Sequence, residues 1–310
     1  MDGHTLTKLD FESLWGEPLS AWVVDRLERR DLRYAVLAAE QRDQVLLEIM
    51  GVLLGETPRA GKHRSSDWES GWTENLTLYV ASGDDRALVP RYFNKNPVVR
   101  WRQELVRSES PTLEFDLFAT LLDWVLDTRV PDHTKALYEF GCGTGHNLLR
   151  ARERFPRAKI TGLDWATSSQ EAIRALSRAH DDEHMGAQHF DFFNPDTSLD
   201  LDSSSAVLTV AALEQVGSGF SPFLDYLCGQ RPTAVVHIEP IRELLDPENL
   251  MDFLSIEYFK KRDYLDGYLT ELRRRETIGE VEILEARRTF VGSLFIDGYS
   301  LIVWRPIDGA

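Results

Sequence analysis

A run of glycines between residues 139 and 145 is the part of the sequence best suited to hold a nucleotide. The segment EFGCGTG has Gly141, Gly143 and Gly145 at alternate positions, after a predicted strand and before a predicted helix. Glycine permits a positive φ and a close approach of the backbone to a ligand, and the start of a helix offers unpaired N–H groups. Asp164 follows Gly145 by 19 residues at the end of the next predicted strand, where a carboxylate can accept hydrogen bonds from both ribose hydroxyls. The spacing predicts a nucleotide-binding turn.

Three titratable residues at or after later predicted strands are candidates for proton transfer. Glu214 follows the strand predicted at 206–210, and His237 and Glu239 lie at the end of the strand predicted at 234–238. Ligands of open α/β sheets bind outside the carboxyl ends of the strands, and side-chain alternation puts His237 and Glu239 on one face. We therefore predict that a catalytic base, if the reaction uses one, is among these three residues. A purely structural role for each of them is an open alternative.

With its glycine turn and downstream acid, the chain resembles the class I S-adenosylmethionine-dependent methyltransferases over roughly residues 112–306. The first motif of that family has the form E/D-x-G-x-G-x-G, which residues 139–145 match. The resemblance implies that the three glycines line the methionine part of S-adenosyl-L-methionine and that Asp164 holds the ribose. It also implies that Asp191 contacts the adenine amine, that Phe192 packs on the adenine ring and that residues 211–216 face the transferred methyl group. The expected cofactor contacts further include Glu139, Trp165 and Leu213.

Single positions decide between this interpretation and its alternatives. The glycine fingerprint of NAD-binding domains requires a glycine three residues after its second glycine, and this chain has His146 there. Cys142 is explained as a small side chain that fills the loop, because methyl transfer from a sulfonium needs no nucleophile from the enzyme. The transfer is an in-line displacement, so positioning supplies much of the catalysis, and a base is needed only for a protonated amine or an alcohol. We expect no metal site.

These motifs need a parallel sheet to bring them together, and the sequence after Pro131 predicts one. Short β-rich runs alternate with helical patterns, as in βαβ units. We predict strands at 136–140, 159–163, 187–190, 206–210 and 234–238, and helices at 113–126, 146–154, 168–178, from Asp246 onward and at 264–275. Asp297-Gly298 between two further β-rich runs predicts a tight hairpin. The expected fold class is α/β: a Rossmann-like methyltransferase sheet of seven strands, mostly parallel, with an antiparallel C-terminal hairpin and an α-helical N-terminal extension.

The N-terminal third has a different pattern. Residues 19–54 combine strong helix formers with apolar residues at intervals of three and four, which predicts one long or two shorter helices. Residues 55–71 have the composition of a surface loop, and residues 72–101 contain many aromatic side chains. We predict a mainly helical cap and substrate lid at 1–110 and a cofactor-binding methyltransferase domain at 111–310. The aromatic segment and helices at 247–275 are expected to form the acceptor pocket.

Composition limits the partners of the chain. Its 310 residues include 51 acidic and 35 basic side chains, a formal net charge of −16, which disfavours nucleic acid and anionic membranes as partners. No stretch approaches the ~20 apolar residues needed to span a bilayer, and the polar first residues do not form a signal peptide. Cys142 and Cys228 match no disulfide framework. We therefore expect a cytoplasmic protein with reduced thiols.

The leading hypothesis is methyl transfer to oxygen or nitrogen of a small molecule, such as a specialised metabolite or a sugar or glycan precursor. A protein methyltransferase and a non-catalytic cofactor-binding partner protein are the alternatives. The sequence leaves open whether the chain forms a homodimer.

Overall fold

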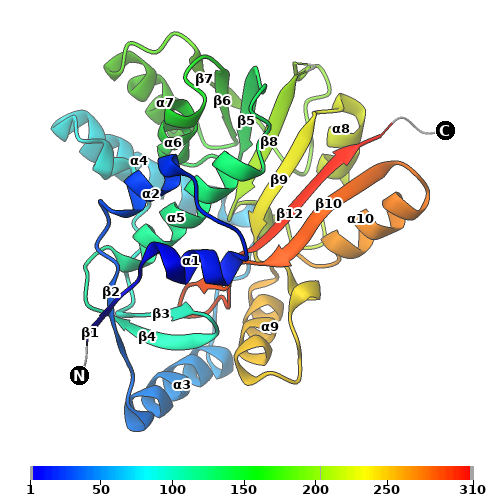
Figure 1. The fold of residues 1–310 in the computed structure, drawn as a ribbon. Helices are drawn as coiled ribbons and strands as arrows, with labels where there is room; N and C mark the ends of the chain where they lie inside the picture. The colour runs from blue at the N-terminus through cyan, green and yellow to red at the C-terminus, as the bar shows by residue number, and fades with distance from the viewer. Residues whose placement is uncertain (1–2, 203, 308–310) are drawn as a thin grey trace.

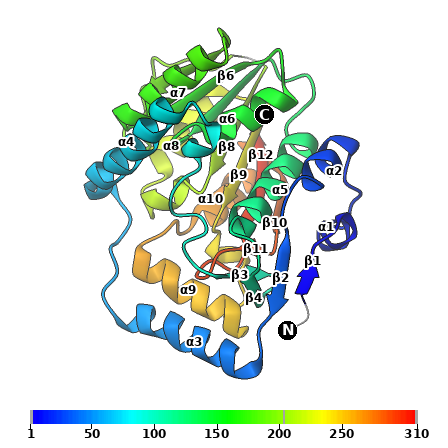
Figure 2. The ribbon, with the colours of Figure 1, turned by 90° about the vertical axis from the view of Figure 1, so that its left-hand side faces the viewer.

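Two β-sheets organise the chain in the computed structural model, which describes residues 3–202 and 204–307 (Figure 1; Figure 2). Within these residues the larger sheet has seven strands in the order β10-β12-β9-β8-β5-β6-β7. Its strands are β5 (Ala136–Phe140), β6 (Lys159–Asp164), β7 (Met185–His189), β8 (Ser205–Val210), β9 (Ala234–Glu239), β10 (Val281–Arg288) and β12 (Ser300–Pro306). The pairs among β5 to β9 are parallel, and β12 is antiparallel to both β9 and β10. This arrangement confirms the predicted sheet.

The central strands follow the predicted ranges closely because their sequences are nearly continuous apolar runs. Every residue of β5, β8 and β9 is buried, as expected for parallel strands covered on both faces. Val236 and Val303 pack in one core with α5 (Leu113–Thr128), α6 (His146–Arg154) and α7 (Thr167–Ala179). Their neighbours Val235 and Ile302 point to the opposite face and pack in a second core with α8 (Ser221–Gln230) and α10 (Tyr268–Thr277). The sheet is therefore the middle of three layers.

The connection between β10 and β12 differs from the predicted tight turn. It spans residues 289–299 and includes β11 (Val291–Gly292), which pairs with β3 (Val98–Trp101) of the smaller sheet. Asp297 is 1% exposed and forms ion pairs with Arg288 and Arg100. The hairpin exists, but the prediction of a two-residue turn at Asp297-Gly298 was wrong. The local Asp-Gly signal contains no information about the ion pair of Asp297 with the remote Arg100.

The N-terminal extension has the expected helices together with strands that the sequence analysis did not predict. The smaller sheet, β1-β2-β4-β3-β11, is antiparallel throughout, and its further strands are β1 (Gly3–Thr5), β2 (Arg33–Val36) and β4 (Glu104–Ser108). The helices are α1 (Lys8–Trp15), α2 (Ala21–Leu27), α3 (Ala39–Leu54) and α4 (Ser65–Ser82). The loop predicted at 55–71 was wrong from Ser65 onward. There, burial of Trp72, Asn75 and Tyr79 stabilises a helix that the polar composition conceals.

Two helices near the C-terminus begin later than predicted. α9 (Leu250–Arg262) starts after Asn249, whose side chain accepts hydrogen bonds from the N–H groups of Met251 and Asp252, so the start predicted at Asp246 was wrong. α10 starts after Gly267, which has a φ of 83°. The short 3-10 helices are η1 (Lys62–Arg64), η2 (Asp85–Leu88), η3 (Leu213–Val216) and η4 (Arg242–Leu244). None of the described helices is both long enough and apolar enough to cross a membrane.

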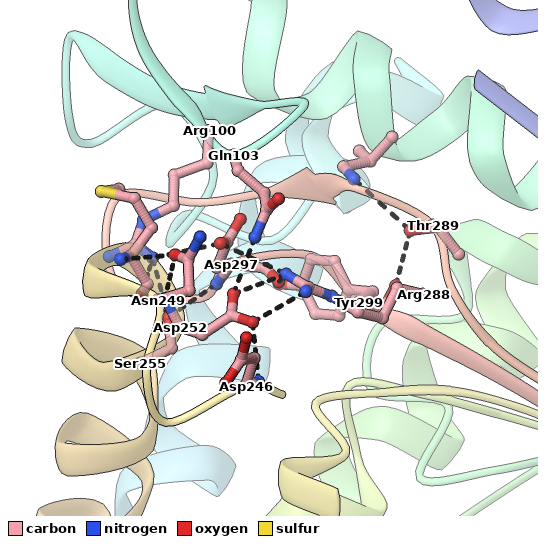
Figure 3. Close-up of polar contacts among 12 residues, drawn as sticks. Arg100, Gln103, Asp246, Asn249, Asp252, Ser255, Arg288, Thr289, Asp297 and Tyr299 are labelled. Atoms are coloured by element: carbon pink, nitrogen blue, oxygen red, sulfur yellow. Dashed lines mark hydrogen bonds and ion pairs between the residues drawn. The ribbon is translucent and has the colours of Figure 1, made fainter. Parts of the chain in front are cut away.

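A buried ion-pair network connects the smaller sheet to α9 and to the end of β10 (Figure 3). Arg288 donates from Nη1 to Asp252 Oδ2 at 2.8 Å and from Nη2 to Asp252 Oδ1 at 2.6 Å. Arg100 is fully buried and donates to Ser255 Oγ at 2.8 Å, and Asp297 lies beside both arginines. Because the two carboxylates balance the two guanidinium groups, loss of any one member would leave a buried charge without its partner.

Candidate cofactor-binding and acceptor site

A pocket opens at the carboxyl ends of the central strands, where open α/β sheets bind their ligands. Its free space is about 800 Å³ with the open mouth included. The turns after β5, β6, β7 and β8 form one side of the pocket, and the N-terminal extension, including α4, forms the other. The lining residues are Trp68, Trp72, Pro90, Tyr92, Phe118, Glu139, Gly141, Cys142, Gly143, Thr144, His146, Asn147, Asp164, Trp165, Phe190, Phe192, Phe193, Val210, Ala211, Ala212, Gln215 and Val216.

The glycine turn after β5 has the conformation that the sequence predicts. Gly141 and Gly143 have φ angles of 72° and 52°, in the left-handed region that glycine enters without strain. A Cβ at Gly141 would overlap the Cβ of Ala212, and a Cβ at Gly143 would lie 3.0 Å from the Trp72 ring. Gly145 is the residue before α6. A side chain at either position would therefore crowd another residue that lines the pocket.

Glu139 is the next-to-last residue of β5, beside this turn, and one of its carboxylate oxygens has no partner among the described residues. Its Oε1 accepts a hydrogen bond from Asn147 Nδ2 at 2.7 Å, whereas Glu139 Oε2 and Asn147 Oδ1 are buried without a partner among the described residues. Burial raises the pKa of Glu139 to about 8, against the effect of the Asn147 hydrogen bond. A buried acceptor without a donor costs roughly 1–3 kcal/mol. The two oxygens can therefore accept hydrogen bonds from a group bound in the pocket. A positively charged donor would also favour the ionised form of the Glu139 carboxyl group.

Asp164 lies at the end of β6, as predicted, and supports the glycine turn. Its Oδ2 accepts the N–H of Gly143 and its Oδ1 accepts the N–H of Ala166, both at 2.9 Å. Burial raises the pKa of Asp164 to about 6, while the backbone hydrogen bonds act in the opposite direction. Because each carboxylate oxygen has two acceptor positions, both oxygens can still accept hydrogen bonds from hydroxyl groups in the pocket.

The rings that follow β6 and β7 lie nearly face to face at the pocket. The ring centroids of Trp165 and Phe193 are 6.5 Å apart and their planes are inclined by 29°. A ring inserted between two others needs about 7 Å, twice the usual contact distance between carbon atoms, so a planar ligand would stack on one of these rings or move them slightly apart. Phe192 also lines the pocket, whereas Asp191 is outside the described lining. Lys62 Nζ lies 2.7 Å from Asp191 Oδ2, so the expected contact of Asp191 with adenine stays a prediction.

Glu239 is buried behind the pocket and binds the backbone. Its Oε1 accepts the N–H groups of Ala212 and Leu213 at 3.0 Å each, and its Oε2 accepts the N–H of Glu214 at 3.2 Å. Burial raises the pKa of Glu239 to about 7. These bonds fix the turn after β8. Leu213 itself is fully buried in the core rather than in the described pocket lining, so this geometry supports structural roles for both residues.

His237 is likewise enclosed by core side chains. Its Nδ1 lies 2.8 Å from Thr209 Oγ1, and its Nε2 accepts the indole N–H of Trp304 at 3.0 Å and lies 2.7 Å from the Tyr268 hydroxyl. Burial lowers the pKa of His237 to about 3, which keeps the imidazole neutral. Its place at the end of β9 agrees with the sequence prediction, but the catalytic role finds no support in this geometry.

Glu214 keeps a free oxygen directly behind the pocket lining. Its Oε1 accepts a hydrogen bond from Gln215 Nε2 at 2.9 Å, and its buried Oε2 has no partner in the described part of the chain. Burial, with a further contribution from Glu239, raises the pKa of Glu214 to about 8. Gln215 lines the pocket, so Glu214 is better placed to influence the site than Glu239 or His237.

The N-terminal extension supplies several pocket residues. The sequence predicted some of them only as part of a longer aromatic segment and did not predict others. Trp72 and Tyr92 belong to the aromatic segment expected at the acceptor pocket, whereas Trp68 lies in the region expected to be a loop. Glu69 holds α4 in place, since its carboxylate accepts the N–H groups of Thr167 and the following residue at the start of α7, at 2.8 and 2.9 Å. These partners are 98 and 99 residues away, so no local signal could reveal the contact.

The fold is shared with solved structures of low sequence identity, whereas no protein-family model and no curated protein sequence matches the chain. The [4+2]-cyclase SpnF aligns with a TM-score of 0.53 at 13% identity, over 82% of this chain and 99% of SpnF. The plantazolicin methyltransferase BpumL, in complex with SAH, aligns with a TM-score of 0.42 at 12% identity, over 80% of this chain and 98% of BpumL. An O-methyltransferase family protein from Burkholderia thailandensis aligns with a TM-score of 0.45 at 14% identity, over 64% and 58% of the two chains.

Likeness at these identities concerns the fold alone. The strand order, the antiparallel β12 between β9 and β10, and the glycine turn after β5 agree with it. The chain therefore has the Rossmann-like fold of the class I S-adenosylmethionine-dependent methyltransferases.

Proposed function

We propose that this protein is an S-adenosylmethionine-dependent methyltransferase that transfers a methyl group to oxygen or nitrogen of a small molecule. The observation that carries the proposal is the convergence of the glycine turn, Asp164 and the unpartnered oxygen of Glu139 in one pocket. These are the motif positions that the family resemblance assigns to the cofactor.

The polar and aromatic groups of the pocket fit the parts of this cofactor. Glu139 Oε2 and Asn147 Oδ1 are free acceptors that match the ammonium group of its methionine part. Asp164 offers acceptor positions to the ribose hydroxyls, and Trp165 and Phe193 offer faces to the adenine ring. The glycine turn leaves the backbone accessible between these groups.

The residues of the chain would bind and orient the reactants. When bound, the cofactor supplies a methyl group activated by a positively charged sulfur. Residues 211–216 after β8 are expected to face this group, and Glu239 fixes their backbone through three hydrogen bonds. The aromatic side chains Trp68, Trp72 and Tyr92 would exclude water from the acceptor side. Such positioning is the main contribution that a methyl transfer needs from its enzyme.

A small-molecule acceptor is the best match to this pocket, because Trp68 and Trp72 of α4, with Pro90 and Tyr92, cover it on one side. A protein methyltransferase would have to admit a side chain past α4, and a non-catalytic cofactor-binding partner protein would need no acceptor space. The cytoplasmic location, the exclusion of nucleic acid and the formation of a homodimer stay predictions.

A second candidate is cyclisation of a bound substrate on the same fold, because the aligned structure SpnF is a [4+2]-cyclase. In that case the methyl group of the cofactor would remain in place, since joining two parts of one molecule consumes no methyl group.

Binding and transfer experiments separate these functions. Calorimetry should detect binding of S-adenosylmethionine and S-adenosylhomocysteine but not of NAD, and binding of NAD alone would refute the proposal. The protein should then be incubated with methyl-labelled cofactor and a metabolite extract, where label in a small molecule supports the proposed reaction. Label in polypeptides would favour the protein methyltransferase. Cofactor binding without transfer would favour the cyclase or the non-catalytic partner.

A further inference from the structure

The fully buried side-chain atoms of the pocket lining that lack a hydrogen-bond partner are mostly acceptors. Among its described residues, the buried side-chain atoms without a partner are Glu139 Oε2, His146 Nε2, Asn147 Oδ1 and Gln215 Oε1. The two amide oxygens can only accept hydrogen bonds in this arrangement, and Glu139 Oε2 also accepts when its carboxyl group is ionised. The described lining includes the carboxylates of Glu139 and Asp164 but no Lys or Arg. The pocket is therefore suited to groups that donate hydrogen bonds and are not negatively charged.

The hydrogen bonds of His146 determine which of its ring nitrogens carries the proton. His146 Nδ1 lies 3.3 Å from Thr144 Oγ1. The Thr144 hydroxyl donates its single proton to the carbonyl of Leu88 at 2.5 Å, so the imidazole must be the donor in its contact with Thr144. Nδ1 is therefore protonated and Nε2 has a free lone pair. Burial, assisted by the charge of Arg150, lowers the pKa of His146 to about 3, so the ring stays neutral near pH 7.

The surroundings of His146 are those of an apolar acceptor site. Its ring contacts Phe115 and Phe93, with centroid distances of 6.1 and 6.5 Å, and Phe118 and Tyr92 line the same pocket. In the proposed function the ammonium, ribose and adenine of the cofactor have other partners, which leaves His146 Nε2 free.

We infer that this pocket selects a methyl acceptor without negative charge that presents an N–H or O–H group on an apolar body, an amine or an alcohol, and that His146 Nε2 accepts a hydrogen bond from that group. The inference rests on the proposed function and adds the substrate class and the residue that positions it. An acceptor with a carboxylate or phosphate would be buried beside two carboxylates with no cation in the described lining, an arrangement that is strongly unfavourable.

The transfer step balances with His146 as a positioning residue. The lone pair of the acceptor nitrogen or oxygen forms the new bond to the methyl carbon, the carbon–sulfur bond breaks, and its electron pair stays on sulfur. A neutral amine keeps its N–H proton in the methylated ammonium product, whereas an alcohol passes its O–H proton to His146 Nε2 and from there to water. Because the pKa of His146 is about 3, its imidazole orients the N–H or O–H group through a hydrogen bond but does not retain the proton at neutral pH.

Four probes that share one ring test the predicted selection on protein saturated with S-adenosylhomocysteine. Benzylamine and benzyl alcohol present a donor, toluene presents none, and benzoate is anionic. Ligand-observed NMR titrations should show benzylamine and benzyl alcohol binding about tenfold more tightly than benzoate, a ratio equivalent to ~1.4 kcal/mol, and more tightly than toluene. Benzoate binding as tightly as benzylamine would overturn the inference. Failure of S-adenosylhomocysteine to bind would instead contradict the proposed function.

Matched variants test the role of His146. His146→Gln can place an amide oxygen near the position of Nε2, whereas His146→Phe keeps a ring among Phe93, Phe115 and Phe118 but removes the acceptor. His146→Phe should lose the preference for benzyl alcohol over toluene and His146→Gln should keep most of it, with S-adenosylhomocysteine affinity unchanged in both. An equal preference in all three proteins would exclude His146 as the positioning residue.

A measurement on the wild-type protein avoids any effect of substitution on folding. In nitrogen NMR of histidine-labelled protein, His146 should have a protonated Nδ1 and a non-protonated Nε2, and benzyl alcohol should shift the Nε2 resonance. A proton on Nε2 would leave this nitrogen without a free lone pair and would contradict its role as the hydrogen-bond acceptor.

Discussion

Replacing Glu214 by glutamine should stabilise the folded protein progressively as the pH rises. The Oε2 of Glu214 is buried without a partner in the described structure, and burial raises the pKa of this carboxyl from 4.5 to about 8. The folded protein therefore keeps a proton that the unfolded chain releases near pH 4.5. Between these two values unfolding releases a proton, so the wild-type protein loses stability as the pH increases.

The size of the effect follows from the same shift. One pKa unit corresponds to ~1.36 kcal/mol, so a shift from 4.5 to about 8 corresponds to a loss of about 5 kcal/mol in the free energy of unfolding above pH 8. Glu214→Gln removes this loss without changing the shape of the side chain. Its amide oxygen can still accept the hydrogen bond that Gln215 Nε2 donates to Oε1.

Urea unfolding of the wild type and Glu214→Gln from about pH 4.5 to about pH 9 measures the difference. Glu271→Gln is the control, because it should destabilise the protein by an amount that is constant over this pH range. Hydrogen bonds from Arg274 and then Arg275 lower the pKa of Glu271 to about 2, against desolvation. Glu271 therefore contributes stability that is present above its unfolded pKa and is lost as the pH falls towards 2. A difference between Glu214→Gln and the wild type that does not change with pH would refute the reasoning. Methyl transfer that falls while stability rises would indicate a functional role for Glu214.

Three further substitutions test the site and the fold. Asp164→Asn should weaken binding of S-adenosylhomocysteine in calorimetry by about 1–3 kcal/mol, and an unchanged Kd would exclude Asp164 as the ribose ligand. Glu239→Gln turns an amide NH₂ towards a backbone N–H and should lower the free energy of unfolding by about 1–3 kcal/mol while activity per folded molecule is retained; a stable but inactive variant would restore the catalytic role. Arg288→Met leaves the buried Asp252 without its two-bond partner and should cost about 3–5 kcal/mol in urea unfolding, so a cost near zero would mean that the network contributes no stability.

The cofactor side of the pocket was predictable because its signals are local. Gly141 and Gly143 are required by a turn whose φ angles are positive, and this requirement is visible in the residue types alone. Asp164 ends an apolar run whose limits are those of β6. Because parallel strands present their carboxyl ends at one edge of the sheet, the order of strands and turns is enough to place these residues in one pocket.

The side chains behind the pocket were less predictable because remote partners fix them. The position of Glu239 at the end of β9 was correct, but its carboxylate meets N–H groups that lie 25 to 27 residues earlier. His237 meets Trp304, which lies 67 residues later. Periodicity gives the face of a strand to which a side chain points, but not the groups that occupy that face. The short strands of the smaller sheet were missed for the same reason, since β11 reaches it from the far end of the chain.

The charge of the pocket connects binding of the cofactor with its release. Glu139, Asp164 and Glu214 are buried close to the glycine turn with raised pKa values, so their ionised forms lack compensating charge in the free protein. In the proposed function the cofactor arrives with a positively charged sulfur and an ammonium group, which favours these ionised forms. Transfer of the methyl group removes the charge on sulfur but leaves the ammonium in place. The carboxylates thus stabilise the substrate form of the cofactor more than the product form, and this difference favours exchange of the product for a new cofactor molecule.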